Sequence, residues 1–234
     1  MFPVRDNIPS AQPPYVNFAL MGMNVMAYVW EVSWGHQLPQ IVQTIGFVPG
    51  RFLSLLSHDP LGHVPELLAP LFASMFLHGG WLHLLLNMWF LWVFGDNVED
   101  ILGHGRYLFF YLASGVGASL IYVAFAPASM IPLVGASGAI AGVMGAYWSM
   151  FPGARVVTLI PILIIPTFWE LPAFVFIGIW FALQLAQGAY STLSHTAGQG
   201  GVAWWAHVGG FAVGLVLVRL MEPQRARRLL RRRH

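Results

Sequence analysis

The sequence predicts an all-α, polytopic membrane protein: a bundle of six transmembrane helices with a long interfacial first loop. Hydrophobic residues fill 57% of the 234 positions and charged residues only 9%, whereas soluble domains average about 25% charged residues. The mean hydropathy is +0.67, and several apolar runs approach the length needed to cross a bilayer. Because no long polar stretch is left for a separate soluble unit, residues 1–234 are predicted to form one membrane domain.

The predicted spans are, in order, Val16–Trp34, Trp81–Val98, Tyr107–Ala126, Gly135–Phe151, Pro172–Gln187 and Trp204–Met221. An even number of spans places both termini on the same side of the membrane. The arginine-rich run within residues 222–234 follows the last span directly, and basic residues mark the cytoplasmic side. Both termini are therefore predicted to be cytoplasmic, with residues 222–234 as a basic tail that binds anionic membrane lipid and not nucleic acid.

All eleven basic residues are arginine, which indicates a GC-rich genome and hence the inner (plasma) membrane of a bacterium. The first span is preceded by a single arginine, Arg5, and by prolines, and no small-x-small cleavage site follows it. It is therefore predicted to be a retained helix and not a signal peptide. The chain has no cysteine, which excludes disulfides, thiolate catalysis and cysteine-based metal sites. The sequence carries no signal for an oligomeric state.

The connections between spans differ in character. Residues 35–80 are apolar but divided by prolines, so this first loop is predicted to lie on or in the outer interface. Val156–Pro166 is β-branched and cut by two prolines, and is predicted to form an interfacial hairpin on the cytoplasmic side. Residues 188–203, rich in Gly, Ser and Thr, are predicted to be a flexible outer loop.

Four polar residues are predicted to gather in the outer third of the membrane. The second, fourth and sixth spans all begin at the outer face, and near their starts they carry His83, Ser137 and His207. Asn87 shares a helix face with His83 because the two are four residues apart. Ionisable groups inside a membrane are candidates for function, and a serine beside a histidine forms a nucleophile and its base.

The chemistry assigns a role to each of these residues. His207 would take the proton of Ser137, while the side chains of His83 and Asn87 and the backbone N–H of Ser137 would stabilise an oxyanion. No Asp or Glu lies near the outer third of these three spans, so the sequence predicts a Ser-His dyad. The fourth span has 17 residues, roughly 25 Å of helix, and is expected to begin below the surface, beneath a water-filled indentation.

Small residues recur at every fourth position in the fourth and sixth spans. Ser137, Ala141 and Gly145 share one face of the fourth, and Gly210 and Gly214 share one face of the sixth. Such spacing allows helix backbones to approach closely. The two spans are therefore expected to touch, as a Ser137–His207 hydrogen bond requires.

Four segments carry a resemblance to a known family. They are His78–Asn87, Gly95–Gly103, Gly135–Gly138 and Ala206–Gly214. In this order they resemble the motifs of the rhomboid intramembrane serine proteases, over a catalytic core of about residues 70–218. The resemblance implies Ser137 as nucleophile, His207 as base, His83 and Asn87 as oxyanion residues, and a structural role for Glu99.

The same resemblance implies cleavage of transmembrane protein substrates near the outer face, with small residues at the cut and helix-breaking residues beyond it. It implies no metal and no organic cofactor. Two features depart from the family pattern. Ala141 stands where many members carry a tyrosine packed on the base, and residues 35–80 lack the frequent Trp-Arg pair.

Other functions stay open on the sequence alone. A catalytically silent relative that binds membrane clients is one alternative, and a haem or metal protein using His78, His83 and His207 is another. A channel or transporter is disfavoured because no internal repeat is visible. In the fifth span, the bulky Phe174, Phe176, Trp180 and Phe181 form a hypothetical lateral gate. The loop histidines, His104 among them, are expected to be solvated.

Overall fold

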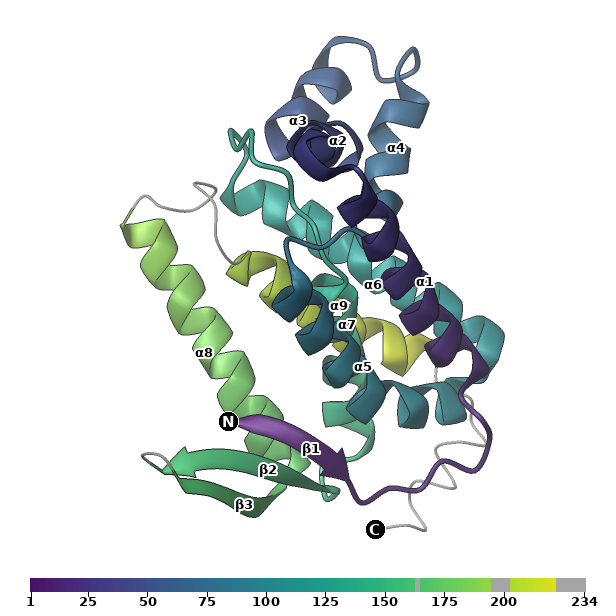
Figure 1. Cartoon of the computed structure of the whole chain (residues 1–234), viewed down its shortest axis with the longest axis vertical. Coiled ribbons are helices and arrows are strands. Elements are labelled where there is room, and N and C mark those ends of the chain that lie inside the picture. Colours follow the sequence, from purple (N-terminus) through teal and green to yellow (C-terminus); the bar gives the residue numbers. More distant parts are fainter. Residues whose placement is uncertain (163–164, 195–202, 222–234) are drawn as a thin grey trace.

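The fold was analysed in a computed structural model that describes residues 1–162, 165–194 and 203–221 (Figure 1). The helices are α1 (Tyr15–Ser33), the 3-10 helix η1 (Gly35–Gln37), α2 (Leu38–Ile45), α3 (Pro49–His58), α4 (Val64–Ala73), α5 (Trp81–Leu102), α6 (His104–Phe125), α7 (Ser137–Met150), α8 (Ala173–Leu193) and α9 (Trp204–Met221). The strands are β1 (Phe2–Asp6), β2 (Arg155–Ile162) and β3 (Ile165–Pro172).

The long helices form a bundle that has short helices at one end and a small sheet at the other. Figure 1 shows α2, α3 and α4 at one end and the three strands at the opposite end, with α8 standing at one side of the bundle. The most extensive packing is between α7 and α9, and α6 packs against both of them. The predicted helical membrane bundle is confirmed, with a small antiparallel sheet as an addition that the sequence analysis did not anticipate.

Each predicted span corresponds to one long helix. The sixth span has the predicted bounds of α9, and the first, fourth and fifth begin within two residues of α1, α7 and α8. Among the residues that the structure describes, three helices, α6, α8 and α9, are long and apolar enough to cross a membrane. The count of six spans and the cytoplasmic side of the termini stay predictions, and the basic tail at residues 222–234 lies outside the described residues.

One expectation about the connections is corrected, and another connection is described in more detail. The outer loop predicted from residue 188 begins later, because α8 continues to Leu193 with hydroxyls of Ser191 and Thr192 bonded to the Gly188 carbonyl. Residues 195–202 of that loop lie outside the described residues. The first loop is largely helical, since its apolar pieces form α2, α3 and α4; its location at the outer interface stays a prediction.

The three strands form an antiparallel sheet in the order β1-β2-β3. The predicted hairpin is confirmed as β2 and β3, with Val156 opposite Leu171, although β3 extends further than expected, to Pro172. β1 was not predicted. It is fixed by Trp89 of α5, whose indole N–H donates to the Pro3 carbonyl at 2.6 Å, and by Tyr147 of α7, whose hydroxyl donates to Asp6.

The Asp6 carboxyl is a pH-sensitive contact between this sheet and the bundle. Burial raises its pKa from 3.8 to about 6, nearby Asp96 adds to the rise, and the Tyr147 hydrogen bond opposes it. A carboxyl with a raised pKa binds its proton more tightly in the folded protein. The protonated form therefore stabilises the fold at pH 4, and this contribution is lost as the pH rises through 6.

We expect Asp6→Asn to weaken the pH dependence of stability. The midpoint of thermal unfolding in detergent should fall for the wild type between pH 4 and pH 7 by more than it falls for Asp6→Asn. The exposed Asp59→Asn should follow the wild-type curve. Parallel curves for the wild type and Asp6→Asn would show that Asp6 does not titrate in this range.

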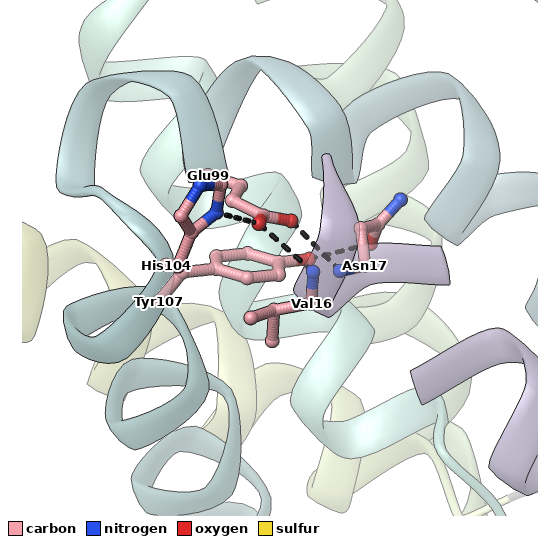
Figure 2. A network of polar contacts seen from close by, with 5 residues as sticks. All are labelled: Val16, Asn17, Glu99, His104 and Tyr107. Atoms are coloured by element: carbon pink, nitrogen blue, oxygen red, sulfur yellow. Dashed lines mark hydrogen bonds and ion pairs between the residues drawn. The ribbon is translucent and has the colours of Figure 1, made fainter. Parts of the chain in front are cut away.

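A buried polar network joins the start of α1 to α5 and α6 (Figure 2). The carboxylate of Glu99, 1% exposed, accepts the backbone N–H groups of Val16 at 2.9 Å and Asn17 at 2.7 Å. It also pairs with His104 at 2.5 Å, and the Tyr107 hydroxyl donates to the Asn17 side chain at 2.7 Å. Glu99 thus caps α1 from another helix, and the expectation that His104 is merely solvated is wrong.

We expect Glu99→Ala to lower the free energy of unfolding by about 3 kcal/mol, because it leaves buried N–H donors at the start of α1 without an acceptor. The measurement is unfolding in detergent, followed by tryptophan fluorescence. Glu66→Ala is the matched control, since Glu66 is exposed on α4. Equal stabilities of the two variants would contradict a structural role for Glu99.

Close contact between α7 and α9 depends on glycine. A Cβ added at Gly210 would lie 2.0 Å from the carbonyl oxygen of Gly138, and one added at Gly214 would lie 2.2 Å from that of Gly142. The two backbones touch directly at these points, as the spacing of small residues predicted. This contact fixes the first turn of α7 against the first turns of α9.

Candidate active site

Ser137 and His207 lie near the starts of α7 and α9, the two helices whose backbones touch. Ser137 is the first residue of α7, and His207 is in the first turn of α9. The Ser137 Oγ and the His207 Nε2 are 2.8 Å apart, within hydrogen-bonding distance. The structure thus brings together two residues that are 70 positions apart in the sequence.

A glycine turn positions Ser137. Gly135 has φ +120°, a left-handed conformation that glycine tolerates, and its N–H donates to the Ser74 carbonyl at 2.9 Å. A Cβ at Gly135 would lie 2.8 Å from the His83 ring. The absence of a side chain at Gly135 therefore lets His83 approach the backbone just before Ser137.

His83 and Asn87 lie on α5 beside this turn, and both line the same cavity as Ser137. The Nδ1 of His83 accepts the Gly79 N–H at 3.3 Å, so a neutral ring carries its proton on Nε2. That Nε2 faces Gly135. Asn87 is 6% exposed, and its amide Nδ2 has no hydrogen-bond partner among the described residues. His83 and Asn87 thus border the same cavity as Ser137, and the Asn87 amide has a donor left over.

His78 lies behind this group and not in it. It is 2% exposed, its ring packs at 5.2 Å from that of His83, and its backbone N–H donates to the Glu31 carboxylate of α1. Burial, with His83 close by, lowers the pKa of His78 to about 4, so the ring is neutral at ordinary pH. Glu31, to which the sequence analysis gave no role, holds the chain that leads into α5.

A cavity of about 670 Å³ opens in front of the Ser137–His207 pair. Its walls come from α5 (Leu86, Phe90), from α7 (Met144) and from α8 (Trp180), so it is mostly apolar. Trp180 borders this space as the gate hypothesis requires. Phe176 does not: it is 1% exposed and stacks on Phe94 in the core.

The sequence analysis missed Gln184, which adds a third side chain to the Ser137–His207 pair. The side-chain oxygen of Gln184, on α8, lies 2.8 Å from His207 Nδ1. The rings of Trp180 and Trp204 also flank His207, at 6.1 Å and 6.3 Å between centroids. These contacts hold the imidazole in a chain that has only a methyl group at Ala141. A signal was available, since Gln184 is a polar residue close to the predicted outer end of the fifth span.

The contacts of His207 also bear on the metal alternative. Both of its ring nitrogens are engaged, one by Ser137 and the other by Gln184, and a ligating histidine needs a free nitrogen lone pair. Within residues 1–162, 165–194 and 203–221, no group of three His, Cys, Asp or Glu residues is placed to hold a metal ion.

Comparison with known proteins supports the assignment of a family. The Rhomboid domain model matches residues 65–224. Rhomboid protein 1, mitochondrial, of Saccharomyces cerevisiae is 29% identical over 93% of this chain and 57% of its own length. RHOMBOID-like protein 6, mitochondrial, of Arabidopsis thaliana is 32% identical over 66% of this chain and 44% of its own length.

A bacterial relative is similar over a shorter segment. Rhomboid protease GluP of Bacillus subtilis is 43% identical over 32% of this chain and 14% of its own length. The chain spans about half the length of the two mitochondrial relatives. The domain model matches most of the sequence, and the apolar helices and the order of the motifs agree with it. This chain therefore belongs to the rhomboid family of integral membrane proteins.

Proposed function

We propose that this chain is an intramembrane serine endopeptidase that hydrolyses peptide bonds in or near the transmembrane helices of other membrane proteins. The observation that carries the proposal is the 2.8 Å contact between Ser137 Oγ and His207 Nε2 at the wall of a cavity. A nucleophile within hydrogen-bond reach of its base is the arrangement that acyl transfer requires. The protease name of the Bacillus subtilis relative agrees with it.

The positions of these side chains support the following assignment of roles. Ser137 Oγ attacks the carbonyl carbon of the scissile peptide while His207 Nε2 takes the hydroxyl proton. The oxyanion accepts hydrogen bonds from His83 Nε2–H and Asn87 Nδ2–H. When the C–N bond breaks, the imidazolium returns the proton to the leaving amine. Water then attacks the acyl-enzyme with His207 again as base, which releases the new carboxylate and restores Ser137.

The lining of the cavity supports a substrate class. The surface beside Ser137 is mostly apolar, with walls from α5 and α8, so it suits an apolar segment of a membrane protein better than a soluble peptide. We propose a location in a membrane without assigning an organelle. The expected bacterial plasma membrane finds no support in the two relatives that are named mitochondrial.

Reconstituted protein with a single-span reporter provides the test. The wild type, in lipid vesicles, should cut the reporter, and a fluorophosphonate should attach to Ser137, as located by mass spectrometry. A catalytically silent relative that only binds clients would bind the reporter without cutting it and would not be labelled. Folded protein that shows neither cleavage nor labelling would refute the proposal.

The oxyanion assignment makes a separate prediction. We expect His83→Ala and Asn87→Ala each to lower kcat about 10²-fold, because each removes one donor to the oxyanion. KM should change little, since the donors act on charge that develops in the transition state. Leu85→Ala is the control, because Leu85 lies on the same helix and is 61% exposed. A rise in KM at constant kcat would assign these residues to substrate binding.

A further inference from the structure

The strongest unexplained feature of the site is the amide on α8. Gln184 is only 7% exposed, on a helix whose composition is mostly apolar. Burying an amide is unfavourable unless it is hydrogen-bonded. Its oxygen bonds to His207 Nδ1 at 2.8 Å, so the acceptor of the buried amide is satisfied by the base of the site.

We propose that Gln184 is a positioning residue that sets the tautomer and the orientation of His207. This inference rests on the proposed protease function. A side-chain amide oxygen can only accept a hydrogen bond, so Nδ1 of the neutral ring must carry the proton. The lone pair is then on Nε2, which faces the Ser137 hydroxyl at 2.8 Å. Only this tautomer can remove the proton from Ser137.

The same hydrogen bond acts during the reaction. When His207 takes the proton of Ser137, the ring becomes positively charged, and the amide dipole at Nδ1–H stabilises that charge. A neutral amide achieves this without the cost of an ionised carboxylate in apolar surroundings. Gln184 thus occupies the place that an acidic residue holds in a Ser-His-Asp triad.

The contacts of His207 also connect it to helix α8. Trp180 is one turn before Gln184 on α8, and the four-residue spacing presents both side chains to His207. His207 is therefore held between Ser137 of α7 and two side chains of α8. A change in the position of α8 would alter the orientation of the base directly.

The test compares Gln184→Met with Gln187→Met. Methionine keeps the length of the side chain without the amide, and Gln187 is exposed three residues further along the same helix. Gln184→Met should lower kcat at least tenfold with little change in KM, and should slow fluorophosphonate labelling by a similar factor. Gln187→Met should match the wild type in both measurements.

Labelling separates positioning from control of substrate entry, because a small fluorophosphonate does not need α8 to admit a helix. If cleavage falls while labelling keeps its wild-type rate, Gln184 acts on substrate entry and the proposal is wrong. It is equally wrong if both rates stay within twofold of the wild type. Inactive wild-type protein would refute the protease function itself, which is a different outcome.

A second variant covers the case in which Gln184→Met does not fold. Gln184→Glu keeps an acceptor at Nδ1 and adds negative charge. It should retain cleavage while the acidic limb of its pH–rate profile moves to higher pH, because the imidazolium is stabilised by the carboxylate. A profile that superimposes on that of the wild type would overturn the proposal.

Discussion

Ser137→Ala is expected to reduce cleavage by about 10⁴-fold or more, because it removes the only atom that can form the acyl-enzyme. His207→Ala is expected to cause a loss of the same order, since Ser137 then has no base at 2.8 Å. Initial rates on a single-span reporter in lipid vesicles give both values. Fluorophosphonate labelling should disappear in Ser137→Ala and become very slow in His207→Ala.

The double variant provides the sharper result. Residues that act as a unit show losses that do not add, so Ser137→Ala/His207→Ala should be no slower than Ser137→Ala alone. Ser114→Ala and His36→Ala are matched controls: Ser114 is buried on α6, and His36 is exposed near the end of α1. If Ser137→Ala keeps more than a tenth of the wild-type rate, another residue is the nucleophile.

The sequence predicted the site residues because their signals are local. His83 and Asn87 share a helix face by spacing alone, Ser137 begins α7, and His207 lies in the first turn of α9 next to two glycines. The contact between α7 and α9 could be predicted because glycine at every fourth position has one common purpose in a membrane, the close approach of two helices.

The sheet was harder to predict because its signal is not local. β1 has five residues, one of them proline, and its partner β2 lies about 150 positions away. A strand this short is defined by its pairing and by the groups that anchor it, here Trp89 and Tyr147, and not by its own propensity. The hairpin of β2 and β3 could be predicted because its β-branched residues and prolines are adjacent in the sequence.

Gln184 was missed for a chemical reason. A search for the third member of a catalytic triad looks for a carboxylate, and the outer third of the second, fourth and sixth spans has none. An amide oxygen accepts the same hydrogen bond. The four-residue spacing of Trp180 and Gln184 was visible, but the face of α8 that meets His207 follows only from the packing of α8 on α9.

Gly210→Ala is expected to disable the site without touching a reacting atom. The added Cβ would lie 2.0 Å from the carbonyl oxygen of Gly138, and a backbone atom cannot move aside as a flexible side chain can. Helices α7 and α9 must therefore separate. Gly138 adjoins Ser137 and Gly210 is one turn beyond His207, so the separation occurs at the Ser137–His207 contact. A displacement of about 1 Å can cost roughly 10²-fold in rate.

The measurements are cleavage rate, labelling rate and thermal unfolding in detergent, all compared with Gly178→Ala. Gly178 lies within α8 and has nothing within 4 Å of an added Cβ, so this variant should behave like the wild type. Gly210→Ala should also unfold at a lower temperature than the wild type. Gly214→Ala should show a similar loss of stability, because its added Cβ would lie 2.2 Å from the Gly142 oxygen, one turn deeper. If Gly210→Ala cleaves at the wild-type rate, the close approach of α7 and α9 is not what holds Ser137 against His207.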